Sequence, residues 1–190
     1  MEVDWEVEIG GDAPLIDASW DGLVDLHSAP EFAAQLPESR QFPALAHALV
    51  QLNSEVSPVW TSKCDAWIPE VFDADELDAQ RGEGNCALSC YIDLLPRSQR
   101  TWSSTDHAVA KCRAICGRLR AVPLRCCRAD LILRQAYIAP DRNGFGVTAY
   151  LTACGSTPDL ARATLESALG ALVSAILPVP GPATATSKLQ

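Results

Sequence analysis

Long apolar runs are missing from the sequence. A membrane-spanning helix needs roughly 18 consecutive apolar residues, and the most apolar stretch, residues 165–177, is shorter and amphipathic. The first five residues, Met-Glu-Val-Asp-Trp, also lack the basic segment followed by an apolar one that marks a secretory signal peptide. We therefore expect a cytoplasmic protein that does not bind membranes.

Basic runs are missing too. The chain has 15 Lys and Arg residues against 24 Asp and Glu residues, for a formal net charge of −9. A surface this acidic repels nucleic-acid phosphates and anionic lipid headgroups. The arginines between residues 113 and 128 are spread along an expected helix and the strand after it, not gathered in one patch. The sequence therefore predicts no nucleic-acid partner.

Catalytic and cofactor-binding motifs are absent as well. The chain has no Gly-x-Gly-x-x-Gly after an expected strand, no phosphate-binding loop that ends in Lys-Ser or Lys-Thr, no His-Glu-x-x-His and no Gly-x-Ser-x-Gly. Its three histidines, His27, His47 and His107, lie far apart in the sequence. The sequence thus predicts no cofactor and indicates no catalytic residue, and it leaves open whether the protein is an enzyme.

Cysteine, by contrast, is abundant. Structural zinc sites usually use two close Cys-x-x-Cys pairs. The eight cysteines here have other spacings: Cys86-x3-Cys90, Cys112-x3-Cys116, adjacent Cys126-Cys127, and isolated Cys64 and Cys154. Free cysteine behaves as a small apolar side chain, and Cys112 and Cys116 share the apolar stripe of an expected helix. We predict core thiols and folding without metal or disulfides, with a thiol-ligated metal site and redox chemistry as alternatives.

The length of the chain and its apolar pattern predict how it is organised. The 190 residues, 48% of them hydrophobic, favour one domain over residues 1–177. Residues 178–190, rich in Pro, Ala and Thr, are expected to be a disordered tail. Apolar residues alternate with polar ones in some segments and recur at helical spacing in others. The expected strands are 3–9, 15–26, 59–68, 86–95, 124–138 and 145–153, and the expected helices are 30–53, 105–122 and 158–177.

The order of these elements is ββα, repeated three times. The part from the second strand to the fifth has the order βαββαβ, which is that of a ferredoxin-like core. Hairpins that alternate with helices are typical of a sheet with helices on a single face. We therefore expect a two-layer α+β fold: a mostly antiparallel sheet of about six strands, with the helices on one face and the other face open.

The open face of this sheet is a candidate binding site. Side chains alternate between the two faces of a strand, so the uniformly apolar alternate residues of 127–133 should face the helices, and those of opposite parity should face outward. With the residues of matching parity in the other strands, the outward set comprises Lys63, Asp65, Trp67, Tyr91, Asp93, Arg128, Asp130, Arg134 and Tyr150. A solvated sheet face is also polar, but here the charges lie in mid-strand beside three aromatic rings, as they do at protein interfaces.

Two functions compete for this face. The first is a binding or assembly module that takes a protein partner, a second copy of the chain, or a small zwitterionic or carboxylate ligand. The second is a small-molecule enzyme, because neighbouring charged groups shift one another's pKa when they are partly buried; its acid/base groups would be among Lys63, Asp65, Asp93, Arg128 and Asp130. A thiol-ligated metal-binding protein is a further alternative. The sequence favours the binding module.

Overall fold

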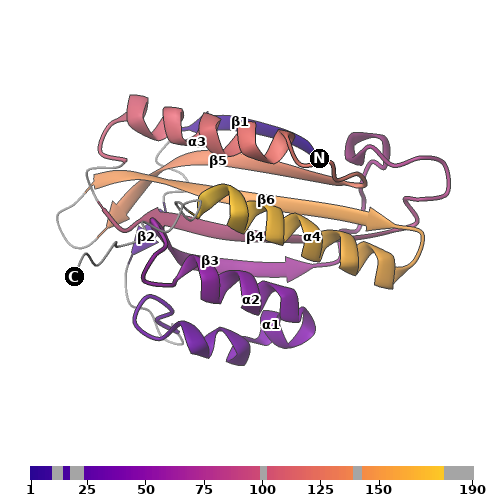
Figure 1. The fold of residues 1–190 in the computed structure, drawn as a ribbon, viewed down its shortest axis with the longest axis horizontal. Helices are drawn as coiled ribbons and strands as arrows, with labels where there is room; N and C mark the ends of the chain where they lie inside the picture. Colours follow the sequence, from indigo (N-terminus) through magenta and orange to yellow (C-terminus); the bar gives the residue numbers. More distant parts are fainter. Residues whose placement is uncertain (10–14, 18–23, 99–101, 139–142, 178–190) are drawn as a thin grey trace, which may run out of the picture.

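In the computed structural model, helices cover one face of a mixed β-sheet (Figure 1). The structure describes residues 1–9, 15–17, 24–98, 102–138 and 143–177. The tail predicted over residues 178–190 and most of the turn predicted over 140–144 lie outside the described residues. A mixed α+β fold, as the sequence predicts, is confirmed.

The strands are β1 (Glu2–Glu8), β2 (Leu15–Asp17), β3 (Val59–Trp67), β4 (Cys86–Pro96), β5 (Cys127–Ile138) and β6 (Asn143–Gly155). Five of them lie side by side in the order β1-β5-β6-β4-β3, and the short β2 also pairs with β5. Both β1 and β2 run parallel to β5. The other neighbours are antiparallel, so the sheet is mixed.

The expected sheet of six strands, mostly antiparallel and in ferredoxin-like order, is not confirmed. β1 and β2 do not form a hairpin: they follow one another along β5, where Glu8 pairs with Arg134 and Leu15 with Ala136. β1 and β2 therefore share a single position in the sheet, on the same side of β5. Of the strand expected over 15–26, the structure describes only Leu15–Asp17 as a strand. Alternation in a sequence fixes which face a side chain takes, but it does not fix which strand lies alongside.

The helical elements are η1 (Pro30–Gln35), α1 (Pro37–Gln41), α2 (Pro43–Leu52), η2 (Asp75–Leu77), α3 (Thr105–Arg120) and α4 (Pro158–Ile176). The single helix expected over 30–53 is wrong, because η1, α1 and α2 replace it. A proline opens each of them, and proline disfavours helical backbone in the residue before it. Leu36 and Phe42 accordingly leave the helical conformation, with ψ angles of 138° and 84°.

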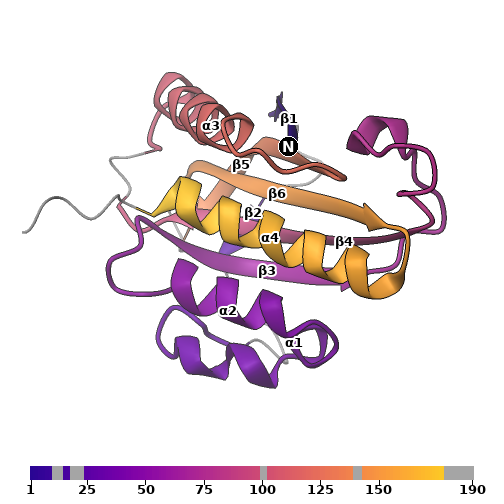
Figure 2. The ribbon, with the colours of Figure 1, turned by 45° about the vertical axis from the view of Figure 1, so that its right-hand side comes forward.

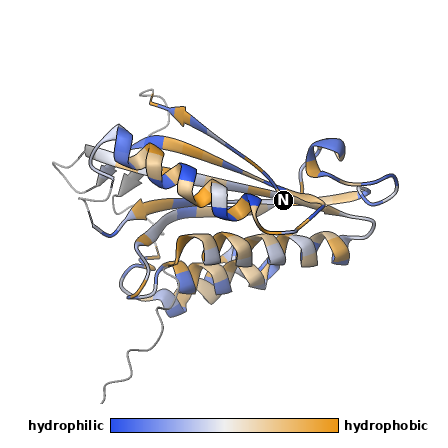
Figure 3. Ribbon diagram, turned by 45° about the horizontal axis from the view of Figure 1, so that its top comes forward, coloured by the Kyte–Doolittle hydropathy of each residue, from blue (hydrophilic) through white to orange (hydrophobic). Residues whose placement is uncertain are grey.

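The helices pack on one face of the sheet, here called the inner face (Figure 2). The apolar parity set predicted in 127–133 is fully buried there. α3 buries one stripe against it, comprising Ala108, Cys112, Ile115, Cys116 and Leu119. The helices carry hydrophilic and hydrophobic residues in turn (Figure 3), as amphipathic helices do. Ser104 caps α3 and Thr157 caps α4, each by accepting a hydrogen bond from a backbone N–H of the first turn.

The opposite face, here called the outer face, is concave at one end. β2 comes close to β3 although the two stand at opposite ends of the strand order. In a flat sheet, four steps of about 4.8 Å would hold them about 19 Å apart. The sheet therefore curls at this end, and Leu95 and Ala136 are fully buried beside Trp60 inside the curl. The outer face is therefore concave where β2 approaches β3.

Candidate functional site

The pairing registers place the predicted site residues on the outer face. One row runs across four strands, from Asp130 to Tyr150, Tyr91 and Asp65. The flanking rows hold Arg128 and Trp67 on one side, and Asp93 and Arg134 on the other. Lys63 lies in the irregular stretch of β3 between Thr61 and Cys64, close enough to Asp93 to lower the pKa of that carboxyl. The parity argument therefore gave the correct face for the residues that these registers pair, whereas no register pair tests Lys63.

Three aromatic rings form a row across β3, β4 and β6. The ring centroids of Trp67 and Tyr91 are 6.3 Å apart, and those of Tyr91 and Tyr150 are 5.7 Å apart. Both separations lie in the range in which aromatic pairs attract one another. Burial, and then the carboxylates of Asp93 and Asp65, raise the pKa of Tyr91 to about 12. The Tyr91 hydroxyl is therefore neutral at physiological pH and can donate a hydrogen bond. We call these three residues the aromatic row.

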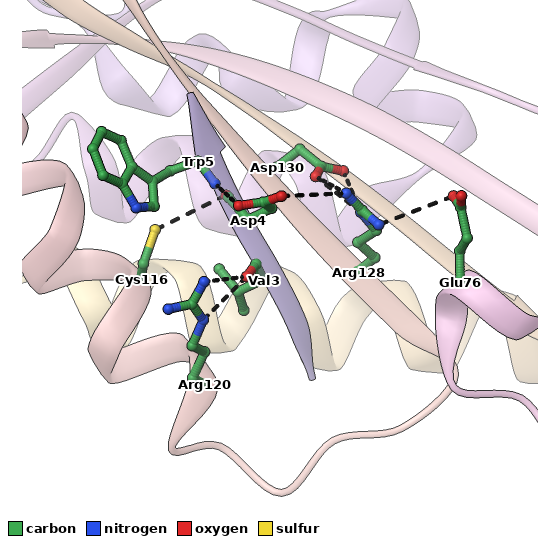
Figure 4. A network of polar contacts seen from close by, with 8 residues as sticks. All are labelled: Val3, Asp4, Trp5, Glu76, Cys116, Arg120, Arg128 and Asp130. Atoms are coloured by element: carbon green, nitrogen blue, oxygen red, sulfur yellow. Dashed lines mark hydrogen bonds and ion pairs between the residues drawn. The ribbon is translucent and has the colours of Figure 1, made fainter. Parts of the chain in front are cut away.

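Arg128 joins three segments of the chain on the same face (Figure 4). Its Nε lies 2.9 and 3.0 Å from the two carboxylate oxygens of Asp130, and its Nη2 lies 2.8 Å from the first of them. The carboxylates of Asp4 on β1 and Glu76 on η2 are each 4.0 Å from the guanidinium. One positive charge thus faces three negative ones, which leaves this part of the face acidic.

The sequence argument missed the acidic residues that β1 adds to this face. The register pairs Glu2 with Arg128 and Asp4 with Asp130, so that every second residue of β1 lies on the outer face. The alternation in residues 3–9 already placed these acids on one side of a strand, but only the parallel pairing with β5 shows which side. The predicted set, with three charges of each sign, is therefore corrected, among the described side chains, to seven carboxylates and three basic groups. The carboxylates are Glu2, Asp4, Glu6, Glu8, Asp65, Asp93 and Asp130, and the basic residues are Lys63, Arg128 and Arg134.

Asp93 lies beneath this surface and not on it. The residue is 5% exposed, and its carboxylate accepts a hydrogen bond of 2.7 Å from the Thr148 hydroxyl. Burial raises its pKa, while the Thr148 hydrogen bond and the charges of Lys63 and Arg134 act in the opposite direction. A carboxyl that is covered in this way supports the face from below and has little access to a ligand.

Hollows in the outer face are lined by different members of the predicted set. A hollow of about 420 Å³ is bounded by Asp4, Glu6, Arg128, Asp130 and Tyr150. A second hollow, of about 290 Å³, shares Arg128 and Asp130 and continues to Val71 and Phe72. Lys63 instead lines a cavity of about 510 Å³ at the edge of the sheet, with Glu38 and Cys64. Among the acid/base groups of the enzyme hypothesis, Lys63 thus lines a different cavity from Arg128 and Asp130.

An exposed apolar lip borders the aromatic row. Trp67, the last residue of β3, is 38% exposed, and Ile68 and Val71 after it are 75% and 88% exposed. A little further along, Leu77 of η2 is buried against Ala87 and Cys154, which fixes this segment to the corner of the sheet. Large apolar side chains that lie exposed side by side are typical of interaction surfaces. The candidate binding residues predicted from the sequence include Trp67 but neither Ile68 nor Val71, so the sequence did not reveal this lip.

Three further findings bear on the class of function. Among the helices of the described residues, none is long and apolar enough to cross a membrane. Within the same described residues, no group of three or more His, Cys, Asp or Glu side chains is arranged to hold a metal ion. No protein-family model, no curated protein and no solved structure matches the chain.

Proposed function

We propose that this chain is a non-catalytic binding module whose outer sheet face docks a basic, amphipathic helix of a partner protein. The observation that carries the proposal is the aromatic row of Trp67, Tyr91 and Tyr150, which crosses three strands beside the exposed lip. Tyrosine and tryptophan are the residues most enriched at the energetic centres of protein interfaces, because they combine a large apolar area with a polar group.

The dimensions of the face favour a helix as the occupant. Five strands about 4.8 Å apart make a surface roughly 19 Å wide, and an α-helix with its side chains is about 10–12 Å across. The inner face of the same strands already packs α3 and α4. A partner helix on the outer face would complete a third layer, with its apolar side chains against the aromatic row and the lip of Ile68 and Val71.

The charge of the face favours a basic partner. Among the described side chains, six carboxylates besides the buried Asp93 accompany three basic groups there, and the whole chain has a net charge of −9. In the 420 Å³ hollow, Asp4, Glu6 and Asp130 surround a single Arg128 beside the Tyr150 ring. A Lys or Arg side chain of the partner would meet surplus negative charge there and an aromatic ring that also attracts cations. A second copy of this chain fits less well, because it would bring the same excess of carboxylates.

The test uses two synthetic amphipathic peptides of about 18 residues, or five helical turns, one built from leucine and lysine and the other from leucine and glutamate. We expect the lysine peptide alone to bind the purified protein, measured by calorimetry. Amide shifts in NMR spectra should concentrate on β3, β4 and β6. Replacing both Trp67 and Tyr150 by Ala should weaken binding at least tenfold, since hot-spot aromatics commonly contribute about 2 kcal/mol or more each.

Matched controls separate the outer face from non-specific attraction. Phe32 and Leu160 are exposed by 44% and 53%, so Phe32→Ala with Leu160→Ala removes comparable apolar area elsewhere and should leave binding unchanged. Asp4→Lys should weaken binding more than Glu166→Lys, which makes the same charge change on α4. Equal effects of the two charge reversals, or a shift pattern centred on α2 and α4, would show that the outer face is not the docking site. Concentration-dependent self-association lost in the Trp67 and Tyr150 variant would replace the proposed partner by a second copy.

A further inference from the structure

Two cysteines face one another where β5 begins and β6 ends. β5 and β6 pair Cys127 with Ala153, so the next pair outward in this antiparallel register is Cys126 with Cys154. The backbone N–H of Cys154 donates a hydrogen bond of 2.8 Å to the carbonyl of Cys126. This hydrogen bond holds the two backbones side by side, and disulfides form where Cα atoms lie about 4.4–6.8 Å apart. The placement of the two residues therefore favours a disulfide.

The side chains are in contact as well. Cys126 packs against the small buried cluster that contains Cys154, and each of the two thiols is close enough to affect the pKa of the other. The Cys126 thiol in turn donates to the carboxylate of Glu83, with 3.6 Å between sulfur and oxygen. Arg125 holds that carboxylate through an ion pair of 3.2 Å. The two sulfurs and one proton acceptor thus form a connected chain.

The backbone of Cys126 has an unusual conformation. Its φ angle is +58°, in the left-handed region that glycine or asparagine adopts at a lower cost in energy than other residues. Strained backbone of this kind is concentrated at functional sites. Here it accompanies a partly exposed thiol next to a buried one. An accessible thiol beside a second, resolving thiol is the usual arrangement of cysteines that are oxidised reversibly.

We propose that Cys126 and Cys154 are a reversible disulfide pair that hydrogen peroxide oxidises. In the first step the Cys126 sulfur attacks one peroxide oxygen and the O–O bond breaks. The thiol proton passes by way of Glu83 to the leaving hydroxide, giving water and a sulfenic acid on Cys126. In the second step the Cys154 sulfur attacks the Cys126 sulfur, the S–S bond forms and the S–O bond breaks, and the Cys154 proton leaves with the hydroxyl group as a second water.

The surroundings of the pair set its rate and its structural effect. Burial, and then the Cys126 sulfur, raise the pKa of the Cys154 thiol to about 11, and burial followed by Glu83 raises that of Cys126. Because the thiolate is the reactive form, oxidation is slow at neutral pH and accelerates as the pH rises. The disulfide removes the thiol proton that Cys126 shares with Glu83. It also links the start of β5 covalently to the end of β6. The proposal does not depend on the docking function.

The experiment treats the reduced, purified full chain with hydrogen peroxide and counts thiols after denaturation. We expect the count to fall from eight to six, with loss of two hydrogen atoms from the intact mass and full recovery on treatment with dithiothreitol. Tryptic digestion without reductant should join the peptide of residues 126–128 to that of residues 143–162. The rate of cross-linking should rise roughly tenfold for each pH unit below the thiol pKa, as the thiolate fraction does.

Variants assign the sulfur atoms. Cys126→Ser and Cys154→Ser should each abolish the cross-link, whereas Cys127→Ser, which changes the neighbouring cysteine in the same tryptic peptide, should keep it. Circular dichroism establishes that each variant is folded, and the mass of the oxidised wild type tests the pair even if Cys154→Ser does not fold. A cross-link that persists in Cys126→Ser, disulfides scattered over several cysteines, or sulfinic acid without any cross-link would each overturn the proposal.

Discussion

The inner and outer faces of the sheet are built from the same strands but hold different chemistry. Along β5, Leu131 and Leu133 are fully buried beneath the helices, whereas Ile132 and Arg134 between and beside them point to the outer face and are partly exposed. The inner face is apolar along its whole length and holds the fold together. The outer face carries rings, charges and hollows that the core does not need. The difference indicates that the outer face can change with little loss of stability.

The largest effect on stability is expected when a buried side chain of the inner face is truncated. Leu131→Ala should lower the free energy of unfolding by about 2–5 kcal/mol, because it removes buried methyl groups and leaves a cavity. Ile132→Ala, one residue along on the partly exposed face, should cost about 1 kcal/mol. Urea unfolding of both variants measures the contrast. Equal losses would mean that the inner and outer faces contribute equally to the free energy of unfolding.

A somewhat smaller effect is expected where β6 passes into the helix layer. A Cβ atom at Gly155 would lie 2.8 Å from Leu160 and closer still to the Ala161 backbone N, so Gly155→Ala must push α4 away from the sheet. We expect a loss of about 1–3 kcal/mol, as in other overpacked sites. Gly170→Ala is the matched control, since nothing lies within 4 Å of its added Cβ. This helical position should gain up to about 1 kcal/mol. Thermal unfolding of both variants should therefore shift in opposite directions.

Two arginines sharpen the contrast at the edge strand. Arg120 of α3 donates hydrogen bonds of 2.7 and 3.1 Å to the carbonyl of Val3, from the inner side (Figure 4). Losing these charge-assisted bonds in Arg120→Ala should cost about 1.5 kcal/mol. Arg128→Ala removes ion pairs on the outer face that are partly exposed to solvent, and should cost less than about 1 kcal/mol. A larger loss for Arg128→Ala in urea unfolding would mean that the outer face, too, is structural.

The smallest effect concerns Asp93, the buried carboxyl of the outer face among the described residues. Burial raises the pKa of Asp93, so the folded chain holds that proton to a higher pH than the unfolded chain does. Stability is therefore lost as the pH rises from the unfolded to the folded pKa. Asp93→Asn cannot ionise and keeps an acceptor for Thr148. It should gain up to about 1 kcal/mol over the wild type at pH 7, and the gain should vanish below about pH 4.

Asp65→Asn is the control for this prediction. Asp65 is exposed, so this variant removes the same charge from the same face without changing a buried group. Urea unfolding at several pH values compares the two variants with the wild type. If Asp93→Asn is less stable than the wild type at neutral pH, attraction to Lys63 and Arg134 outweighs the cost of burial.

Local patterns predicted the parts of the fold that depend on local physics. Alternation along 127–133 gave the correct face for each residue of β5, and the stripe from Ala108 to Leu119 gave α3, because side-chain direction follows from the backbone period alone. The single helix expected over 30–53 was wrong, because Pro37 and Pro43 each open a new helix. The partner of β1 could not be predicted, since nothing in residues 2–8 specifies a strand that lies far along the chain.

The candidate site followed the same division. Parity placed Trp67, Tyr91 and Tyr150 on one face, and the registers then set them side by side. The acidic surplus depends on where β1 pairs, and the burial of Asp93 depends on tertiary packing around it, so neither followed from the pattern. The contact between Cys126 and Cys154 was hidden for a similar reason: a cysteine outside the regular strand has no parity from which its neighbour can be inferred.

The parallel pairing of β1 with β5 also has a consequence during synthesis. Glu2 lies beside Arg128, so β1 cannot join the sheet until the ribosome has made the chain as far as β5. At about 5–20 residues per second, this interval is on the order of ten seconds. Throughout it, the apolar side of β1, with Val3 and Trp5, has no sheet to join, and its acidic side keeps it from pairing with other chains. The charged alternation that marks this strand in the sequence thus protects the nascent chain before it contributes to the finished surface.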